Sequence, residues 1–575
     1  MISPPQQPSL SLRIGVPLLL LGLALAVFSP LSHAEFVHWD DYQTVASNSA
    51  MNPATLDVVM QYWSPWHAKM DLYAPVTYSL WGILAAISPR QTPTAEGFTL
   101  SPALFHLANL LLHAVSAIIV WQILRRLVQN HLAALAGAVL FLVHPVQVEV
   151  VGWISGGKDV LSGMLCLLAL RMYIDFAQAG DGKSQKKYVA YGIATIAFVA
   201  ATLAKPQAVA LPLVAGVIDV LWLKRNLKTA VTGLLLWFAW CIPVALIGRT
   251  VQSANLLYSP VWFRPVVALD AIAFYLGKIF WPAKLMADYG RSPQWLIVSP
   301  DRFWTWIVPV MVIIVCIAVQ RRTWRPLAII FLFIAALAPV LGILQFDFQS
   351  YSTVGDHYLY LAMLAPILAV AWVVAQFDWK KWIAPALLIV AACAIASNRQ
   401  CGVWRDTETL FQHNYELNPS SLAAETVLGV YWSEHGNPKF ALQLLAEAVR
   451  DHPNIGLSHF TYANVLMKQN LMDQSLSEYR QAITLTPTKA RYYTNFGVAL
   501  GKSGHPDLAM AAFQNAAGLD PSDSANYENA AITLLKGGQV DRARWFLNRV
   551  LELDPSRADV RQLLQSLPTT RGGAG

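Results

Sequence analysis

Long runs of apolar residues alternate with short polar segments over the first 400 residues of the chain. A hydrocarbon core of about 30 Å needs about 20 apolar residues in a helix. Eleven segments approach that length: 12–29, 103–124, 131–148, 160–178, 187–204, 206–223, 229–248, 303–320, 326–345, 357–376 and 382–397. Two further stretches, 73–89 and 266–286, are interrupted by prolines or charges. The pattern predicts a polytopic, all-α membrane domain over residues 1–400, with about eleven transmembrane helices.

Basic residues orient these segments, because Lys and Arg concentrate in cytoplasmic loops. If 73–89 and 266–286 lie on the outer face as interfacial helices, every basic run between spans falls in the cytoplasm. This model places the N-terminus inside, a first outside loop at 30–102, and everything after residue 397 outside. The first segment could instead be a cleaved signal peptide ending near Ala34. We favour retention of this segment as a membrane helix, because the polar loop that follows it looks like part of a functional site that the helix anchors.

From residue 415 the pattern changes to a repeat. Prolines recur every 34 residues, at Pro419, Pro453, Pro487, Pro521 and Pro555. A turn residue recurs in phase at Gly436, Asn470, Gly504 and Gly538, and a small residue at Ala441, Ser475, Ala509 and Ala543. This period and these residue types are typical of tetratricopeptide repeats, which stack helix pairs into an α-solenoid.

We therefore predict four repeats over 422–557, preceded by a linker and lead-in helix at 401–421. A capping helix and tail follow at 558–575. Such arrays have a concave face that binds extended segments. Repeats of this kind bind partners and seldom catalyse, so any chemistry is expected in the membrane domain.

Composition narrows the class of protein. The chain is 55% hydrophobic and 13% charged, whereas soluble domains carry about 25% charged residues. Residues 1–400 hold 26 Lys/Arg against 17 Asp/Glu, a net of +9, and residues 401–575 hold 15 against 17, a net of −2. The positive charge thus belongs to short loops between apolar segments, which indicates membrane topology and not a nucleic-acid binder. The five cysteines show no zinc or redox spacing.

The first outside loop carries a pair of acidic residues, Asp40 and Asp41, close after the first apolar segment. The loop is rich in Trp, Tyr and Phe, which place it at the level of the lipid headgroups. A carboxylate that is partly desolvated there has a raised pKa and is a better base. A solvated surface pair is the ordinary alternative, and the aromatic setting argues against it.

Other polar residues follow on the same side of the membrane. The second outside loop ends in Gly156-Gly157-Lys158, which opens the next apolar segment and could offer backbone N–H groups and one cation to a phosphate. An ordinary turn is the alternative. The remaining candidates are His144, Glu149, Asp288, Tyr289, Asp356 and His357.

The chain contains no Walker loop, GxSxG, HExxH or dinucleotide motif. No cytoplasmic loop is long enough to form a nucleotide-binding domain. An enzyme with its site on the outer face would therefore draw on a phosphate-linked donor carried by a lipid in the bilayer.

Several short stretches resemble one family in the expected order. They are Asp40-Asp41 with Asn52-Pro53 behind them, 105–114 with His106, 144–149 and Lys158-Asp159, Ala287-Asp288-Tyr289, 356–361, and Arg399 with Trp404. Together they resemble the transmembrane-and-tetratricopeptide O-mannosyltransferases and their bacterial relatives, within the GT-C glycosyltransferase fold.

The resemblance implies that an acidic residue of the first outside loop acts as base, a role that falls on Asp40 or Asp41. It implies a substrate and donor-phosphate site from Lys158, His357, Asp356, His106, His144, Glu149, Asp288 and Tyr289. Two positions depart from the family pattern, because Lys158 and His357 stand where arginine is usual. Lysine keeps the charge but lacks the bidentate fork, and histidine is titratable.

The implied reaction is an inverting transfer of a sugar from polyprenyl phosphate to a hydroxyl on a protein or glycan. No cofactor is required, although Asp40 and Asp41 could hold a divalent cation such as Mg²⁺ or Mn²⁺. The expected location is a bacterial inner membrane, with membrane lipids around the helices and the acceptor presented by the repeats on the periplasmic side. Two alternatives remain: a non-catalytic scaffold that recruits envelope partners, and a ligase or polymerase of lipid-linked glycans.

Overall fold

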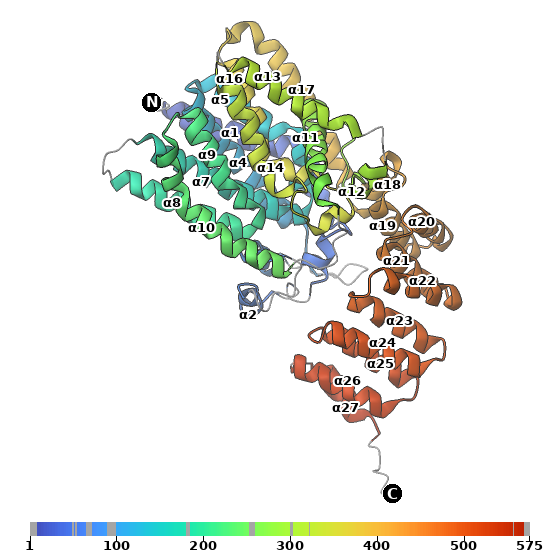
Figure 1. The fold of residues 1–575 in the computed structure, drawn as a ribbon. Coiled ribbons are helices and arrows are strands. Elements are labelled where there is room, and N and C mark those ends of the chain that lie inside the picture. Colours follow the sequence, from blue (N-terminus) through green and yellow to red (C-terminus); the bar gives the residue numbers. More distant parts are fainter. Residues whose placement is uncertain are drawn as a thin grey trace. The chain divides into compact units, whose positions relative to one another are not determined.

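The computed structural model describes residues 9–48, 51, 54–64, 72–88, 99–179, 185–251, 259–298, 303–320, 323–555 and 557–568. Within these residues the chain is helical, and no strand longer than an isolated bridge is formed. The chain divides into two compact units, Met1–Leu417 and Asn418–Gly575 (Figure 1). The prediction of an all-α fold with apolar helices followed by tetratricopeptide repeats is confirmed.

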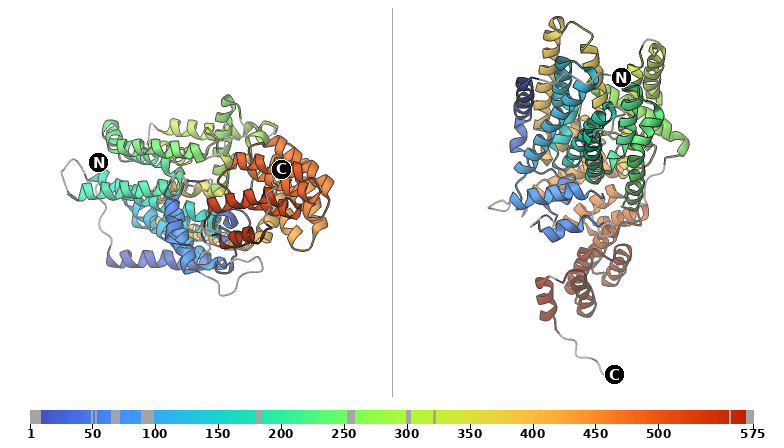
Figure 2. Two further views of the ribbon diagram at one scale, coloured as in Figure 1. Left: turned by 90° about the horizontal axis from the view of Figure 1, so that it is seen from below. Right: turned by 90° about the vertical axis from the view of Figure 1, so that its left-hand side faces the viewer.

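The first unit contains helices long and apolar enough to cross a membrane. Six pass this test: α1 (Leu10–Val27), α4 (Ala103–Val128), α7 (Gly157–Gln178), α8 (Gln185–Ala204), α10 (Leu227–Val251) and α17 (Trp379–Val403). Figure 2 (right) shows the long helices of this unit running in roughly the same direction, up or down. These helices identify the first unit as a multi-pass membrane domain.

Two of the eleven predicted spans are bent helix pairs. α5 (His131–Val143) is followed at 52° by the segment Pro145–Gly152, which contains α6 (Val148–Gly152). The segment Asp356–Ala362, containing α15 (Leu359–Ala362), meets α16 (Leu364–Val374) at 49°. At the first bend Pro145 has no N–H to continue the helix, and His144 before it is extended, with ψ 129°. Counting each pair as one span gives up to eight spans by length and composition.

Three further predicted spans are shorter apolar segments: Pro206–Trp222 with α9 (Leu211–Val217), Trp304–Val319 with α13 (Ile307–Val319), and Arg325–Val340 with α14 (Arg325–Leu337). A purely apolar pattern predicts an uninterrupted helix. Here 3-10 and π turns at the ends shorten the regular α-helices.

The two interrupted stretches form helices shorter than a typical span. α3 (Pro75–Ile87) has 13 residues and α11 (Arg264–Phe280) has 17, against about 20 for a span. The Thr77 hydroxyl donates to the carbonyl of Ala204 at 2.8 Å, which fixes α3 against the end of α8. Both lengths fit interfacial helices.

The boundary between the units, after Leu417, falls within the segment 401–421 that was predicted as a linker and lead-in helix. α17 continues to Val403, and α18 (Thr407–Leu417) belongs to the first unit. The Asn414 side chain on α18 accepts from the Asp288 amide at 2.9 Å and donates to the Asp288 carbonyl at 3.3 Å. These bonds hold α18 against the membrane domain.

The second unit is a stack of helix pairs (Figure 1). The pairs are α19 (Leu422–Glu434) with α20 (Pro438–Asp451), α21 (Gly456–Lys468) with α22 (Met472–Leu485), α23 (Ala490–Lys502) with α24 (Pro506–Leu519), and α25 (Ser524–Lys536) with α26 (Val540–Leu553). A ninth helix, α27 (Ala558–Ser566), follows. The four repeating small residues predicted to pack the second helices are fully buried.

The turn within each pair depends on left-handed backbone. The predicted turn residues have positive φ: Gly436 +83°, Asn470 +59°, Gly504 +79° and Gly538 +73°. Glycine adopts this conformation without the steric cost of a Cβ, and asparagine tolerates it better than most residues.

Gly504→Ala is expected to destabilise the third repeat by about 1 kcal/mol, because alanine is strained at a positive φ. Gly518→Ala is the matched control. It lies in α24, where an added Cβ meets nothing within 4 Å, and alanine should stabilise the helix by about 0.5 to 1 kcal/mol. Hydrogen exchange of 490–523 in the full chain measures both. Equal protection in the two variants would contradict the assignment of the turn.

Candidate active site

The two acidic residues of the first outside loop have different environments. Asp41 is fully buried, and its carboxylate accepts hydrogen bonds from the backbone N–H groups of Ser155 at 2.8 Å and Val37 at 3.1 Å. Burial raises the pKa of Asp41 to about 6, against the lowering effect of these hydrogen bonds. Asp41 therefore joins the first outside loop to the turn that precedes α7, and has no oxygen facing open space.

Asp40 lies beside Asp41 but faces outward. Its side chain is 44% exposed, and its carboxylate accepts from Lys158 Nζ at 3.1 Å. The Asp40 backbone carbonyl accepts from both the amide and the hydroxyl of Thr44 at 2.8 Å, so its main chain is held in a tight turn. Of the pair, Asp40 is the carboxylate that an incoming molecule can reach.

The glycines before Lys158 allow close packing. A Cβ on Gly156 would lie 2.7 Å from the Val150 carbonyl oxygen, and one on Gly157 would lie 2.6 Å from Asn109 Oδ1. Their N–H groups donate to carbonyls within the same turn, from Trp153 to Ser155. The loop amides predicted to form a phosphate cradle are therefore already occupied by internal hydrogen bonds, and the Lys158 ammonium is the remaining candidate of this motif for binding a phosphate.

A second lysine, which the sequence argument did not select, lies next to this cluster. Lys205, between α8 and the turn at Pro206–Ala210, is 12% exposed and pairs with Asp159 Oδ1 at 2.5 Å. Its ammonium also lies 5.5 Å from the centre of the Tyr358 ring. One feature of the sequence could have identified Lys205: it is a single lysine, followed by Pro206, between two apolar segments whose connection is predicted to lie on the outer face.

The two helix bends bring further candidates together. His357 Nδ1 lies 2.6 Å from Glu149 Oε1, and both side chains are buried. The Tyr289 hydroxyl donates to the Asp356 carboxylate, at 2.9 and 3.0 Å from its two oxygens. Glu149 and Asp356 border one narrow space together with Pro145, Leu285, Met286, Gln400 and Trp404.

Trp153 joins the lysine cluster to this buried cluster. Lys158 Nζ lies 4.9 Å from the centre of its ring, within the range of a cation–π interaction. The same indole packs edge-on against His357 at 5.8 Å and lies 6.3 Å from Trp404. Trp153 was not among the predicted site residues, because a single Trp in an aromatic-rich segment carries no distinguishing pattern.

Three predicted residues have other contacts. His144 Nε2 lies 3.0 Å from the Ile279 carbonyl and so ties the first bend to α11. Asp288 Oδ1 accepts from the amide of Gly290 at 2.8 Å, which shapes a turn with positive φ. His106 is buried on α4, and among the described residues it makes no hydrogen bond to Asp40, Lys158 or Glu149. Asn52 and Pro53 lie outside the described residues.

The acidic pair is a poor match for a divalent cation. Asp41 uses both oxygens for backbone amides, and Asp40 is paired with an ammonium group. Among the described residues, no group of three or more His, Cys, Asp or Glu side chains could hold a metal ion.

Comparisons with known proteins find relatives of about half of the chain and of the repeats. Residues 502–567 fit the tetratricopeptide repeat family. The chain is 27% identical over 291 residues to Protein O-mannosyl-transferase Tmtc2 of Drosophila melanogaster, covering 47% of this chain and 30% of that protein. It is 29% identical over 160 residues to Protein O-mannosyl-transferase TMTC1 of Mus musculus, covering 28% and 17%. The chain is a relative of the transmembrane-and-tetratricopeptide O-mannosyl-transferases.

This relationship confirms the resemblance drawn from the short motifs. The matched regions cover no more than about a third of these O-mannosyl-transferases. Among solved structures, the chain is similar to that titled "Crystal structure of MamA", with 17% identity and a TM-score of 0.25 over 28% of this chain and 96% of the other. It is also similar to YrrB, described as a tetratricopeptide-repeat protein with an unusual peptide-binding site, with 20% identity and a TM-score of 0.24 over 28% and 82%.

The different roles of the acidic pair give a stability prediction. At neutral pH, Asp41→Asn replaces one acceptor by an amide donor facing a backbone N–H, and should destabilise the first outside loop by about 1 to 3 kcal/mol. Asp40→Asn is the control, and it should leave the loop intact because Asp40 is half-exposed. Hydrogen exchange of 35–48 measures the difference. Equal protection in the two variants would contradict the buried role of Asp41.

Asp41 should also make this loop sensitive to pH. Because its folded pKa is raised from 3.8 to about 6, the loop is most stable below about pH 4 and loses the pH-dependent part of its stability as the pH rises through about 6. The hydrogen bonds from Val37 and Ser155 to the carboxylate remain at neutral pH. Exchange protection of 35–48, corrected for the intrinsic rate, should therefore fall over that interval. In Asp41→Asn, which does not titrate, this part of the pH dependence should vanish.

Proposed function

We propose that this protein is a membrane glycosyltransferase of the GT-C type that transfers a sugar from a polyprenyl-phosphate-linked donor to a hydroxyl group. The observation that carries the proposal is the half-exposed Asp40 carboxylate 3.1 Å from the Lys158 ammonium, with Lys205 paired to the carboxylate of Asp159, the residue next to Lys158. A base and two cations are the groups that such a transfer needs.

Asp40 acts as the base. It removes the proton from the acceptor hydroxyl as that oxygen attacks the anomeric carbon of the sugar. The bond from the anomeric carbon to the phosphate oxygen breaks at the same time, and the polyprenyl phosphate leaves with the bonding electrons. A single displacement of this kind inverts the anomeric configuration. Asp41 is a positioning residue, because its carboxylate holds the loop and does not face the substrate.

Lys158 and Lys205 stabilise the phosphate that leaves. Both ammonium groups are largely buried and each pairs with one carboxylate. A donor phosphate placed between them would share their charge, and fixed cations in a site with little water stabilise developing negative charge strongly. We assign the second cationic role to Lys205 and not to His357, since His357 Nδ1 is already bound to Glu149.

The names of the relatives support a narrower version of the proposal. Those proteins are called protein O-mannosyl-transferases, so mannose is the sugar and a protein hydroxyl is the acceptor that we propose first. The tetratricopeptide repeats would present an extended acceptor segment. The basic loops between spans support a bacterial inner membrane with this site and the repeats on the periplasmic side.

Asp40→Asn should lower the transfer rate by about 10² to 10⁴-fold, the usual contribution of a general base. The assay uses purified full-length protein, a polyprenyl-phosphate mannose and a Ser/Thr-rich peptide, with product detected by mass spectrometry. Asp57→Asn, in the same outside loop, is the control. Full activity of Asp40→Asn would contradict the assignment of Asp40 as the base. If the unmodified protein formed no product with any acceptor, the result would favour a non-catalytic scaffold.

Lys158→Gln and Lys205→Gln should each lower kcat by about 10² to 10³-fold, as expected when one group that stabilises the leaving charge is lost. Lys158→Arg keeps the charge and should retain most of the activity. Chelation of divalent ions should leave the rate unchanged, because the acidic pair is engaged by protein donors. A rate that fell with EDTA and returned with Mg²⁺ or Mn²⁺ would contradict the metal-free mechanism.

A further inference from the structure

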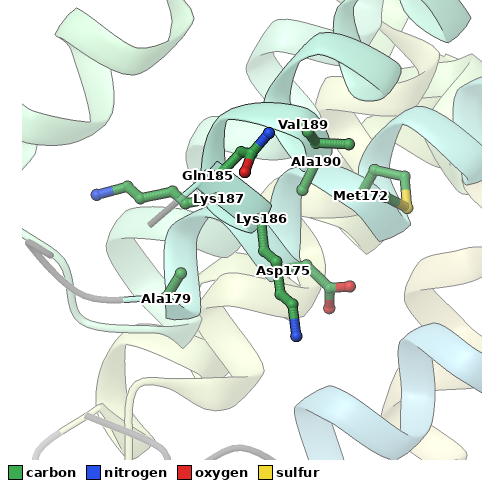
Figure 3. Close-up of a pocket in the computed structure, with 8 residues that line it drawn as sticks. All are labelled: Met172, Asp175, Ala179, Gln185, Lys186, Lys187, Val189 and Ala190. Atoms are coloured by element: carbon green, nitrogen blue, oxygen red, sulfur yellow. The ribbon is translucent and has the colours of Figure 1, made fainter. Parts of the chain in front are cut away.

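A hollow lies at the opposite end of α7 and α8 from the candidate active site. Its volume is about 440 Å³, and its walls include Asp175 from α7 and Gln185, Lys186 and Val189 from α8 (Figure 3). In the close-up, Lys186 extends toward the side of the hollow that holds Asp175, and Lys187 points away. Nothing in the proposed transfer reaction uses this hollow.

The hollow carries a surplus of positive charge. Asp175 is paired with Arg126 of α4, with Nε to Oδ1 at 2.5 Å, and with Arg171 of α7. Lys186 adds a third cation and has no carboxylate partner among the described residues. Since two arginines already neutralise Asp175, Lys186 leaves the hollow with a surplus of positive charge.

An apolar stripe leads away from the hollow along α8. Val189 lines the hollow and is 52% exposed, and the next members are Ile193 at 40% and Ile196 at 72%. Residues spaced by three or four lie on one face of a helix. A ligand that fits both features has a negatively charged head and a hydrocarbon chain.

The length of α7 places the hollow at a membrane surface. The helix runs 22 residues from Gly157 to Gln178, or about 33 Å at 1.5 Å per residue. This matches the thickness of the hydrocarbon core. Since Lys158 lies at one end of α7 and the hollow at the other, the hollow lies at the surface opposite the candidate active site, where phospholipid headgroups are found.

We propose that this hollow is a binding site for an anionic phospholipid. The phosphate accepts from Lys186, and one acyl chain lies along Val189, Ile193 and Ile196. Basic pockets between transmembrane helices bind anionic headgroups by the same chemistry. A soluble phosphate would use the cations but not the stripe. The inference does not depend on the proposed transfer reaction.

Native mass spectrometry of the purified full chain in a neutral detergent tests the proposal. Phosphatidylglycerol and phosphatidylcholine with identical acyl chains are titrated in parallel. The first phosphatidylglycerol should bind at least about fivefold more tightly than phosphatidylcholine. Lys186→Gln should weaken phosphatidylglycerol binding by about fivefold, since each basic residue near the surface contributes about that factor. Phosphatidylcholine binding should not change.

Lys228→Gln is the matched control, because Lys228 is exposed at the start of α10, at the same membrane surface but outside the hollow. It should leave the affinity for phosphatidylglycerol unchanged. An equal loss in both variants would reduce the effect to general surface charge and overturn the proposal. So would unchanged binding in Lys186→Gln, or displacement of the lipid by excess glycerol 3-phosphate, which would indicate a site for soluble anions.

Discussion

Asp41 is a buried carboxylate whose two oxygens accept hydrogen bonds from backbone N–H groups on different segments, Val37 in the first outside loop and Ser155 before α7. A buried carboxylate without such donors would be costly, so the loop and the turn stabilise each other. This contact fixes where the neighbouring Asp40 lies. Asp40 reaches Lys158 because Asp41 holds their two segments together, and the close packing of Gly156 and Gly157 allows the turn to approach.

The helix bends matter for the same reason. Irregular backbone at membrane depth is tolerated where it is buried in protein or lines a cavity. Buried polar residues lie beside both bends: Glu149 follows the first, and Asp356 and His357 precede the second. The Glu149–His357 pair joins the two bends, and Trp153 packs between this pair and Lys158. The site is thus assembled from interruptions in helices and not from the regular spans.

The fold and the site differ in how much of each could be predicted from the sequence, because some features depend on local residues and others on distant contacts. The repeat fold could be predicted because its determinants are local: a proline ends each pair, and Gly504 or its equivalents form each turn. The bends were missed because the spans were assigned from apolar length alone, although Pro145 marks the first interruption. The acidic pair was predictable as a pair, but the separate roles of Asp40 and Asp41 depend on Ser155, which is 114 residues away. Lys205 was missed because its partner Asp159 lies on another helix.

The proposed transfer requires a polyprenyl phosphate to bind beside Lys158 and Lys205, on the face that carries Asp40. The most direct test is photo-crosslinking of the purified full chain with a polyprenyl-phosphate analogue whose reactive group sits next to the phosphate, followed by peptide mapping. Labelling is expected at the start of α7 and around Lys205, and it should decrease with excess polyprenyl-phosphate sugar and in Lys158→Gln. Labelling confined to the other end of α7, or absent from both lysine segments, would contradict the proposed transfer.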